Sequence, residues 1–161
     1  MIKFYNKLFD LDYCNYMYEF AINNFIEDIR TKNGWNAMTN KSNEFEIELK
    51  DKLKNHIDWS NRYVEWINLT TYETNRYLQL HTDSRSTQTL VIQLNNEFTG
   101  GEFVISDSID EEIIKMNTGD CLMFNGSKLM HGVNQIKSGI RYSLNIWTKE
   151  IHIPKKQLAN S

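Results

Sequence analysis

The sequence predicts a mainly β protein of the α+β class, in which two N-terminal helices support a β jelly roll. Apolar residues recur with helical spacing only before about residue 60. After that point, short strand-like segments follow one another with turn residues between them, which is typical of a sandwiched or closed β architecture. We expect one domain over 1–161, with helical support over about 1–60, the jelly-roll core over about 61–150 and a tail over 151–161.

Two helices are predicted in the N-terminal part. The first follows an apolar stripe at steps of three and four residues, formed by Cys14, Tyr18, Ala21, Phe25 and Ile29. Asp10 or Asp12 is a suitable N-cap for it, and Asn33-Gly34 is a suitable end. The second is expected to begin near Asn43, with Glu46 completing a capping box. Its buried side would consist of Phe45, Leu49, Leu53 and Ile57.

Seven strands are predicted after the helices. They are bounded by turn-forming residues, above all glycine and asparagine. The predicted strands cover 63–69, 77–81, 87–94, 102–105, 113–116, 121–124 and 141–148. The helices would cover the outer face of one sheet formed by these strands.

Composition excludes some classes of protein. A net charge of −3 argues against a general nucleic-acid-binding surface. No apolar stretch approaches the 18 residues or so that a membrane span requires. The N-terminus lacks the apolar run of a signal peptide, so we expect a cytoplasmic protein. Cys14 and Cys121 are then expected to be reduced and buried.

Two of the four histidines lie in a context that suggests metal binding. His81-Thr-Asp83 places an imidazole and a carboxylate two residues apart, and such positions project to the same face of a strand. His131 follows a later apolar run and a short loop. Two histidines and one carboxylate form the facial triad of non-haem Fe(II) oxygenases, which leaves open coordination positions. On these residues alone, a chance pairing remains an alternative to a metal site.

The strand that begins at Arg141 adds an anion site. Alternation places one set of side chains on the opposite face from Tyr142, Leu144 and Ile146, namely Arg141, Ser143, Asn145 and Trp147. The tryptophan indicates that this polar face is partly enclosed. A buried arginine needs an anionic partner, and no nearby acidic residue supplies one. We therefore expect a ligand carboxylate at Arg141, bound by the guanidinium fork.

Six short motifs follow one another between Tyr72 and Trp147. They are YLQLHTD (77–83), LN (94–95), FTGGE (98–102), GDCLMF (119–124), HGV (131–133) and GIRYSLNIW (139–147). In this order they resemble the Fe(II)/2-oxoglutarate-dependent dioxygenase superfamily, in particular its prolyl-4-hydroxylase-like branch. The resemblance covers about half of the chain. It implies a double-stranded β-helix, which is a jelly roll, with N-terminal helices against the larger sheet.

The resemblance also implies roles for individual residues. The Fe(II) ligands would be His81, Asp83 and His131. Arg141 would pair with the distal carboxylate of 2-oxoglutarate, with a second hydrogen bond from Ser143. Other residues expected around the oxoacid are Tyr77, Gln93 and Asn145. On the substrate side we expect Trp147, Arg85 and Tyr72.

The activity implied by the resemblance is hydroxylation of an unactivated C–H bond. O₂ is consumed, 2-oxoglutarate becomes succinate and CO₂, and ascorbate can serve as an auxiliary reductant. The expected substrate is a prolyl or other residue in a peptide or protein, and a free amino acid or other small molecule is the alternative. A cupin-like metalloprotein without oxygenase activity is a different class, but cupins usually carry HxH with a following glutamate. A family member that binds without catalysis is a further alternative. The acidic net charge and the lack of a basic-aromatic patch argue against nucleic acid as a partner.

Overall fold

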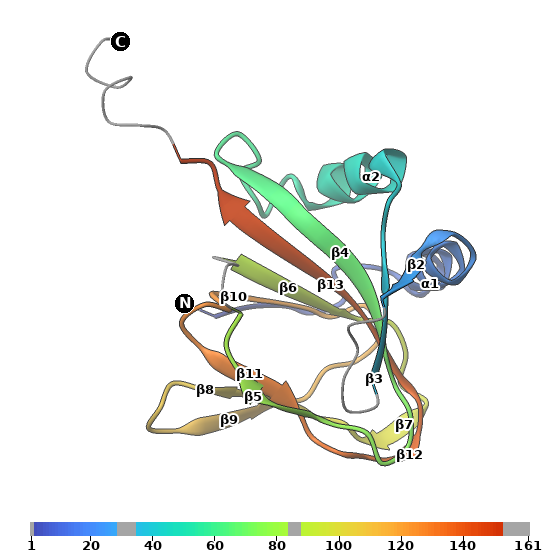
Figure 1. Cartoon of the computed structure of the whole chain (residues 1–161), viewed down its shortest axis with the longest axis vertical. Coiled ribbons are helices and arrows are strands. Elements are labelled where there is room, and N and C mark those ends of the chain that lie inside the picture. The colour runs from blue at the N-terminus through green and yellow to red at the C-terminus, as the bar shows by residue number, and fades with distance from the viewer. Residues whose placement is uncertain (1, 29–34, 84–87, 153–161) are drawn as a thin grey trace.

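The protein is described by a computed structural model that covers residues 2–28, 35–83 and 88–152. Its β-strands form two main layers, a seven-stranded sheet and a four-stranded sheet, which face each other as a sandwich (Figure 1). A two-stranded sheet lies at one end. All strand pairs are antiparallel. The mainly β jelly roll predicted from the sequence is confirmed.

The strands of each sheet come from distant parts of the chain. The larger sheet has the order β1 (Lys3–Tyr5), β10 (Cys121–Phe124), β6 (Gln88–Gln93), β13 (Arg141–Glu150), β4 (Arg62–Tyr72), β3 (Trp35–Thr39) and β2 (Ile26–Asp28). The smaller sheet has the order β5 (Leu78–His81), β11 (Met130–Val133), β8 (Phe103–Ser106) and β9 (Glu111–Ile114). The two-stranded sheet pairs β12 (Ile136–Gly139) with β7 (Phe98–Gly100).

Two helices cover the outer face of the larger sheet, as expected (Figure 1). The N-caps of α1 (Leu11–Asn24) and α2 (Asn43–Leu53) are Asp10 and Ser42, whose side chains accept from the backbone N–H groups of Tyr13 and Phe45. The apolar faces of the helices join the outward residues of the sheet in one buried core, which includes Cys14, Met17, Ala21, Phe45, Leu49, Leu53, Leu90, Ile92, Leu144 and Ile146. In the part of the chain that the structure describes, neither helix has the length and apolarity that a membrane span needs.

The end of the first helix differs from the prediction. The helix stops at Asn24, and Phe25 already has extended backbone angles. Asn23 and Asn24 turn their side chains back to the carbonyls of Glu19 and Phe20. β2 then pairs with β3 at the edge of the larger sheet, because sheet pairing outweighs the helical spacing of the apolar residues. Ile29 and the expected end at 33–34 lie outside the described residues.

The N-terminal part therefore supplies more than helical support. Strands β1, β2 and β3 belong to the larger sheet, although the sequence suggested no strand before residue 60. Each of these strands has five residues or fewer, which leaves too little alternation to identify them. The same holds for β7, β11 and β12. The seven predicted strands are all present, with shifted bounds at most ends.

The pairing of β11 with β5 depends on Gly132. A β-carbon at this position would lie 2.5 Å from the carbonyl oxygen of Leu78. The absence of a side chain lets the two strands approach, and a register shift between His131 and Val133 accompanies the contact. The pairing aligns His131 directly with His81.

The two cysteines are free and fully buried, as expected. Burial, with nearby Asp10 and Asp120, raises the pKa of Cys14 to about 11. Burial, with Asp120, raises the pKa of Cys121 to about 12. We expect a maleimide reagent at neutral pH to leave both thiols unmodified in the folded protein and to label both in denaturant. Rapid labelling of the native protein, followed by mass spectrometry, would contradict this burial.

Candidate metal and oxoacid site

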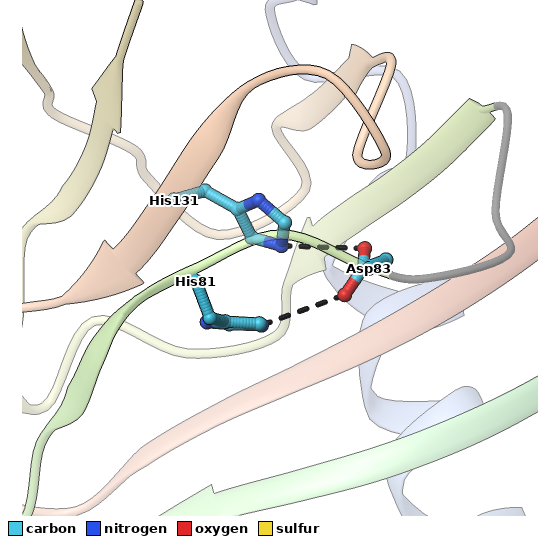
Figure 2. A group of neighbouring side chains, drawn as sticks. All are labelled: His81, Asp83 and His131. Carbon is cyan, nitrogen blue, oxygen red and sulfur yellow. Dashed lines mark ion pairs between the residues drawn. The ribbon is translucent and has the colours of Figure 1, made fainter. Parts of the chain in front are cut away.

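Three side chains predicted as metal ligands meet between the two sheets (Figure 2). Their ligand atoms all lie within 4.8 Å of one another. The Nε2 atom of His81 is 3.4 Å from Oδ1 of Asp83, and Nε2 of His131 is 3.3 Å from Oδ2. Donors about 2.1 Å from an octahedral ion and at right angles lie about 3 Å apart. Two of the spacings are close to that value and none exceeds 4.8 Å, so side-chain adjustment can bring all three donors to one metal ion.

Backbone carbonyls orient both histidine rings. Nδ1 of His81 lies 2.9 Å from the carbonyl oxygen of Gln79, and Nδ1 of His131 lies 2.9 Å from that of Leu129. A carbonyl can only accept, so each Nδ1 carries the hydrogen and donates it. These bonds fix the ring directions and turn Nε2 of each histidine toward Asp83, where Nε2 can bind a metal once any proton that it shares with the carboxylate has left.

Asp83 is held as a carboxylate. Thr89 Oγ1 and Trp147 Nε1 donate to its Oδ2 atom over 3.0 and 3.2 Å. Burial by itself would raise the pKa of Asp83, but hydrogen bonds from His131, His81 and Thr89 outweigh burial and hold the pKa well below its ordinary value. Two neutral imidazoles and one carboxylate on one side of an ion are the donor set of non-haem Fe(II) sites.

The second predicted part of the site is the anion-binding residue Arg141, at the start of β13. The Arg141 side chain is 1% exposed, and its guanidinium carbon lies 5.5 Å from the centre of the Tyr72 ring. Its Nη1 donates to Ser143 Oγ over 3.3 Å, but Nε and Nη2 have no partner among the described residues. Burial lowers the pKa of Arg141. Two unpartnered donors on a buried cation fit the two oxygens of a ligand carboxylate.

The polar face of β13 lies inside the sandwich, as its alternation predicted. Ser143 is fully buried and Asn145 is 7% exposed, while Leu144 and Ile146 point into the helix-covered core. Asn145 Nδ2 donates to Thr70 Oγ1 on the neighbouring strand β4. Trp147 lies farther along the same face and contacts Asp83. Strand β13 thus carries both Arg141, which was predicted to bind the oxoacid, and Trp147, which contacts Asp83 of the metal triad.

Other predicted residues take different positions. Tyr77 is 45% exposed and lines a hollow with Val104. Since the neighbours of Val104 in β8 point into the core, this hollow lies on the outer face of the smaller sheet, and the structure does not bring Tyr77 to Arg141. Gln93 is a cross-strand neighbour of Ser143, but its amide nitrogen donates to Asn96 and to the carbonyl of Met116.

The three residues expected on the substrate side have different outcomes. Tyr72 is 3% exposed and lies against Arg141, so the structure places it at the oxoacid end. Burial raises the pKa of Tyr72 to about 12, against the opposing effect of Arg141. Arg85 lies outside the described residues. Trp147 is half-buried and meets the exposed ring of Trp66 edge to face, with centroids 5.9 Å apart.

The structure adds two residues to the site that sequence reasoning missed. Thr89 lies in the apolar strand β6, where nothing in the sequence marks it as a partner of Asp83. Gly126 follows β10, and a β-carbon there would lie 2.4 Å from both Asp83 Oδ2 and Thr89 Oγ1. Neither contact follows from residue spacing, because each depends on how the segment that contains Asp83 folds back against β6 and the turn after β10.

Solved structures with the same fold include several oxygenases. A prolyl-4-hydroxylase from Pseudomonas putida superposes with a TM-score of 0.73 at 12% identity, covering 94% of this chain and 93% of that one. A 2OG-Fe(II) oxygenase family protein from Burkholderia pseudomallei gives 0.74 at 13% identity, covering 92% and 84%. At these identities the likeness shows the fold alone.

Sequence comparison is more specific. A PKHD-type hydroxylase from Psychrobacter sp. (strain PRwf-1) is 38% identical over 80 residues, which are 46% of this chain and 30% of that protein. PKHD-type hydroxylase PiuC from Pseudomonas aeruginosa is 33% identical over 73 residues, or 45% and 31%. The chain thus spans about 30% of the length of the curated relatives it matches. The sequence model of the 2OG-Fe(II) oxygenase superfamily matches residues 45–149, a segment that contains the His81, Asp83, His131 cluster and Arg141. The chain belongs to the 2OG-Fe(II) oxygenase superfamily.

Proposed function

We propose that the protein is an Fe(II)- and 2-oxoglutarate-dependent oxygenase that hydroxylates an unactivated C–H bond and releases succinate and CO₂. One observation carries the proposal beyond a general metal site. The guanidinium of Arg141 is buried, and two of its nitrogens have no partner within residues 2–28, 35–83 and 88–152; it lies on the same sheet face as Trp147, which contacts Asp83. A dicarboxylate co-substrate supplies the missing anion, and an oxoacid of this kind can also bind the metal.

The residues divide into two groups in this proposal. His81, Asp83 and His131 hold Fe(II) through two imidazole nitrogens and one carboxylate oxygen. Arg141 and Ser143 bind the distal carboxylate of 2-oxoglutarate, since both present polar atoms to one buried spot. Bound iron supplies the oxidation of 2-oxoglutarate by O₂. The protein positions the co-substrate and keeps bulk water from the reacting atoms.

For the substrate we propose a prolyl or other residue in a peptide. The PKHD-type names of the sequence relatives support hydroxylation. Among the similar folds is a Trichoplax adhaerens prolyl hydroxylase, solved with a peptide fragment of hypoxia inducible factor, at a TM-score of 0.72 and 14% identity. The small-molecule alternative has support of the same kind, because HygX from Streptomyces hygroscopicus was solved with nickel, 2-oxoglutarate and hygromycin B at a TM-score of 0.72. A cytoplasmic location remains a prediction from the sequence.

Uncoupled turnover tests the reaction without knowledge of the substrate. With Fe(II), ascorbate and O₂, we expect the protein to convert 2-oxoglutarate to succinate slowly, because such sites oxidise the co-substrate even without substrate. Succinate is measured by mass spectrometry against a sample without iron. No succinate above that background, in protein that binds both iron and 2-oxoglutarate, would contradict the oxygenase function.

A substrate screen then separates the two substrate classes. Proline-containing peptides and free amino acids are incubated under the same conditions, and products are scored for the gain of one oxygen atom. We expect a hydroxylated peptide and faster succinate formation in the same reaction. Oxygen gain only in free amino acids would favour the small-molecule alternative.

A further inference from the structure

We propose that Thr89 and Trp147 are positioning residues that bind one oxygen of Asp83 and thereby direct its other oxygen to the metal. Gly126 provides the space for this arrangement. The inference rests on the proposed metal site and adds residues beyond its three ligands. We call the contacts of Thr89 and Trp147 with Asp83 the carboxylate clamp.

The clamp compensates for the position of Asp83 outside the sheet. β5 ends at His81, so Asp83 has no strand partner to fix it. Its backbone N–H donates to the carbonyl of Gly126 over 2.8 Å, which anchors the main chain. The side chain would still be free to rotate, and the clamp restricts that rotation through two further bonds.

Both donors of the clamp come from the larger sheet. Thr89 on β6 and Trp147 on β13 are direct partners in the strand register. Their donor atoms lie 3.0 and 3.2 Å from the same atom, Asp83 Oδ2. The rigid pairing of the two strands therefore sets the position of this oxygen.

Binding of two donors to one oxygen distinguishes the two carboxylate oxygens. Each carboxylate oxygen offers about two lone-pair directions. Oδ2 accepts from Thr89 and Trp147 and also lies 3.3 Å from the Nε2 atom of His131, so its lone-pair directions are used. Oδ1 lies 3.4 Å from the Nε2 atom of His81 and has no donor from Thr89 or Trp147. The clamp thus favours binding of the metal through Oδ1 alone. One-oxygen binding conserves open positions on the ion for other ligands.

Gly126 lies against both ends of one clamp bond. A β-carbon there would be 2.4 Å from Asp83 Oδ2 and 2.4 Å from Thr89 Oγ1. The side chains of Asp83 and Thr89 are short, so neither can move away from this β-carbon without breaking the hydrogen bond between them. Alanine at position 126 should therefore break the hydrogen bond between Thr89 and Asp83, although both donor side chains of the clamp remain present.

Conservative variants and Co(II) binding test the clamp without reliance on activity. Thr89→Val and Trp147→Phe each remove one donor and retain most of the side-chain volume, while Thr89→Ser retains the hydroxyl. We expect the two donor-removing variants and Gly126→Ala to bind Co(II) about 10- to 100-fold more weakly, as for other partners of metal ligands. Their visible Co(II) spectra should change, because the coordination of the carboxylate changes. Thr89→Ser should resemble the wild type in both.

The outcomes separate the clamp from the proposed function. Thermal unfolding of the metal-free variants shows whether each is folded, and Trp147→Phe tests the clamp independently if Thr89→Val is not. Wild-type affinity and an unchanged Co(II) spectrum in a folded donor-removing variant would overturn the clamp and leave the metal site intact. Failure of the wild-type protein to bind Co(II) or Fe(II) would overturn the proposed function and the clamp together.

Discussion

Replacement of Arg141 by methionine should stabilise the ligand-free protein and abolish tight binding of 2-oxoglutarate. The guanidinium is buried, and two of its nitrogens have no partner in the described part of the chain, so its removal eliminates a charge that no described carboxylate compensates. We expect the free energy of unfolding to rise by about 1 to 4 kcal/mol, as when buried ionic groups are replaced by apolar ones. Loss of a buried charge pair with the co-substrate costs about 3 kcal/mol or more, so affinity for 2-oxoglutarate should fall at least 100-fold.

A matched surface variant controls for charge alone. Arg76 is exposed, so Arg76→Met removes the same charge without a buried cation. We expect Arg76→Met to change neither the free energy of unfolding nor 2-oxoglutarate affinity by a comparable amount. Denaturant titration and calorimetric binding in the presence of Mn(II) measure both quantities. Loss of metal binding in Arg141→Met, with 2-oxoglutarate affinity retained, would show that Arg141 has been assigned to the wrong part of the site.

Replacement of His131 by alanine should remove the metal and all turnover that depends on it. His131 is 5% exposed and supplies one of the three donors, so the remaining pair cannot hold the ion in the same geometry. For the wild type, metal at about 100 times its dissociation constant should stabilise the fold by about 2.7 kcal/mol. We expect this stabilisation and succinate formation to be lost in His131→Ala.

His152→Ala is the control for a general effect of histidine loss, because His152 is exposed. It should keep both the metal-induced stabilisation and succinate formation. Thermal unfolding with and without Mn(II) measures the first, and mass spectrometry measures the second. Metal-induced stabilisation of His131→Ala equal to that of the wild type would show that the ion binds elsewhere.

The sequence predicted the functional parts that depend on local pattern. A strand places positions i and i+2 on one face, which is why His81 and Asp83 were expected to converge. Alternation also predicted that Arg141 lies on the opposite face from Leu144, and Trp147 on the face of Arg141 indicated that this face is partly enclosed. That His131 lies beside His81 and Asp83 was expected from the family resemblance and not from residue spacing, because β11 is too short to be recognised as a strand in the sequence.

The features that sequence reasoning missed depend on contacts between distant segments. Trp147 meets Asp83 from a distant part of the chain because β13 lies beside β6, the strand that carries Thr89. Tyr77 comes directly before β5, and the pairing of β5 with β11 contains a register shift. The number of residues between Tyr77 and His81 therefore did not predict on which face of the smaller sheet the Tyr77 side chain lies. The early end of the first helix likewise reflects pairing of β2 with β3. The order of strands in a sheet is not encoded in the local spacing of residues.

The carboxylate clamp has a mechanical consequence for the sandwich. His81 and His131 belong to the smaller sheet, whereas Thr89 and Trp147 belong to the larger one. Asp83 contacts side chains from both layers, so its carboxylate acts as a cross-brace between two sheets that otherwise meet through apolar packing. Separation of the layers at this point would require the breaking of directional bonds as well as the exposure of apolar surface. The residue that completes the metal site thus also links the two layers between which the site lies.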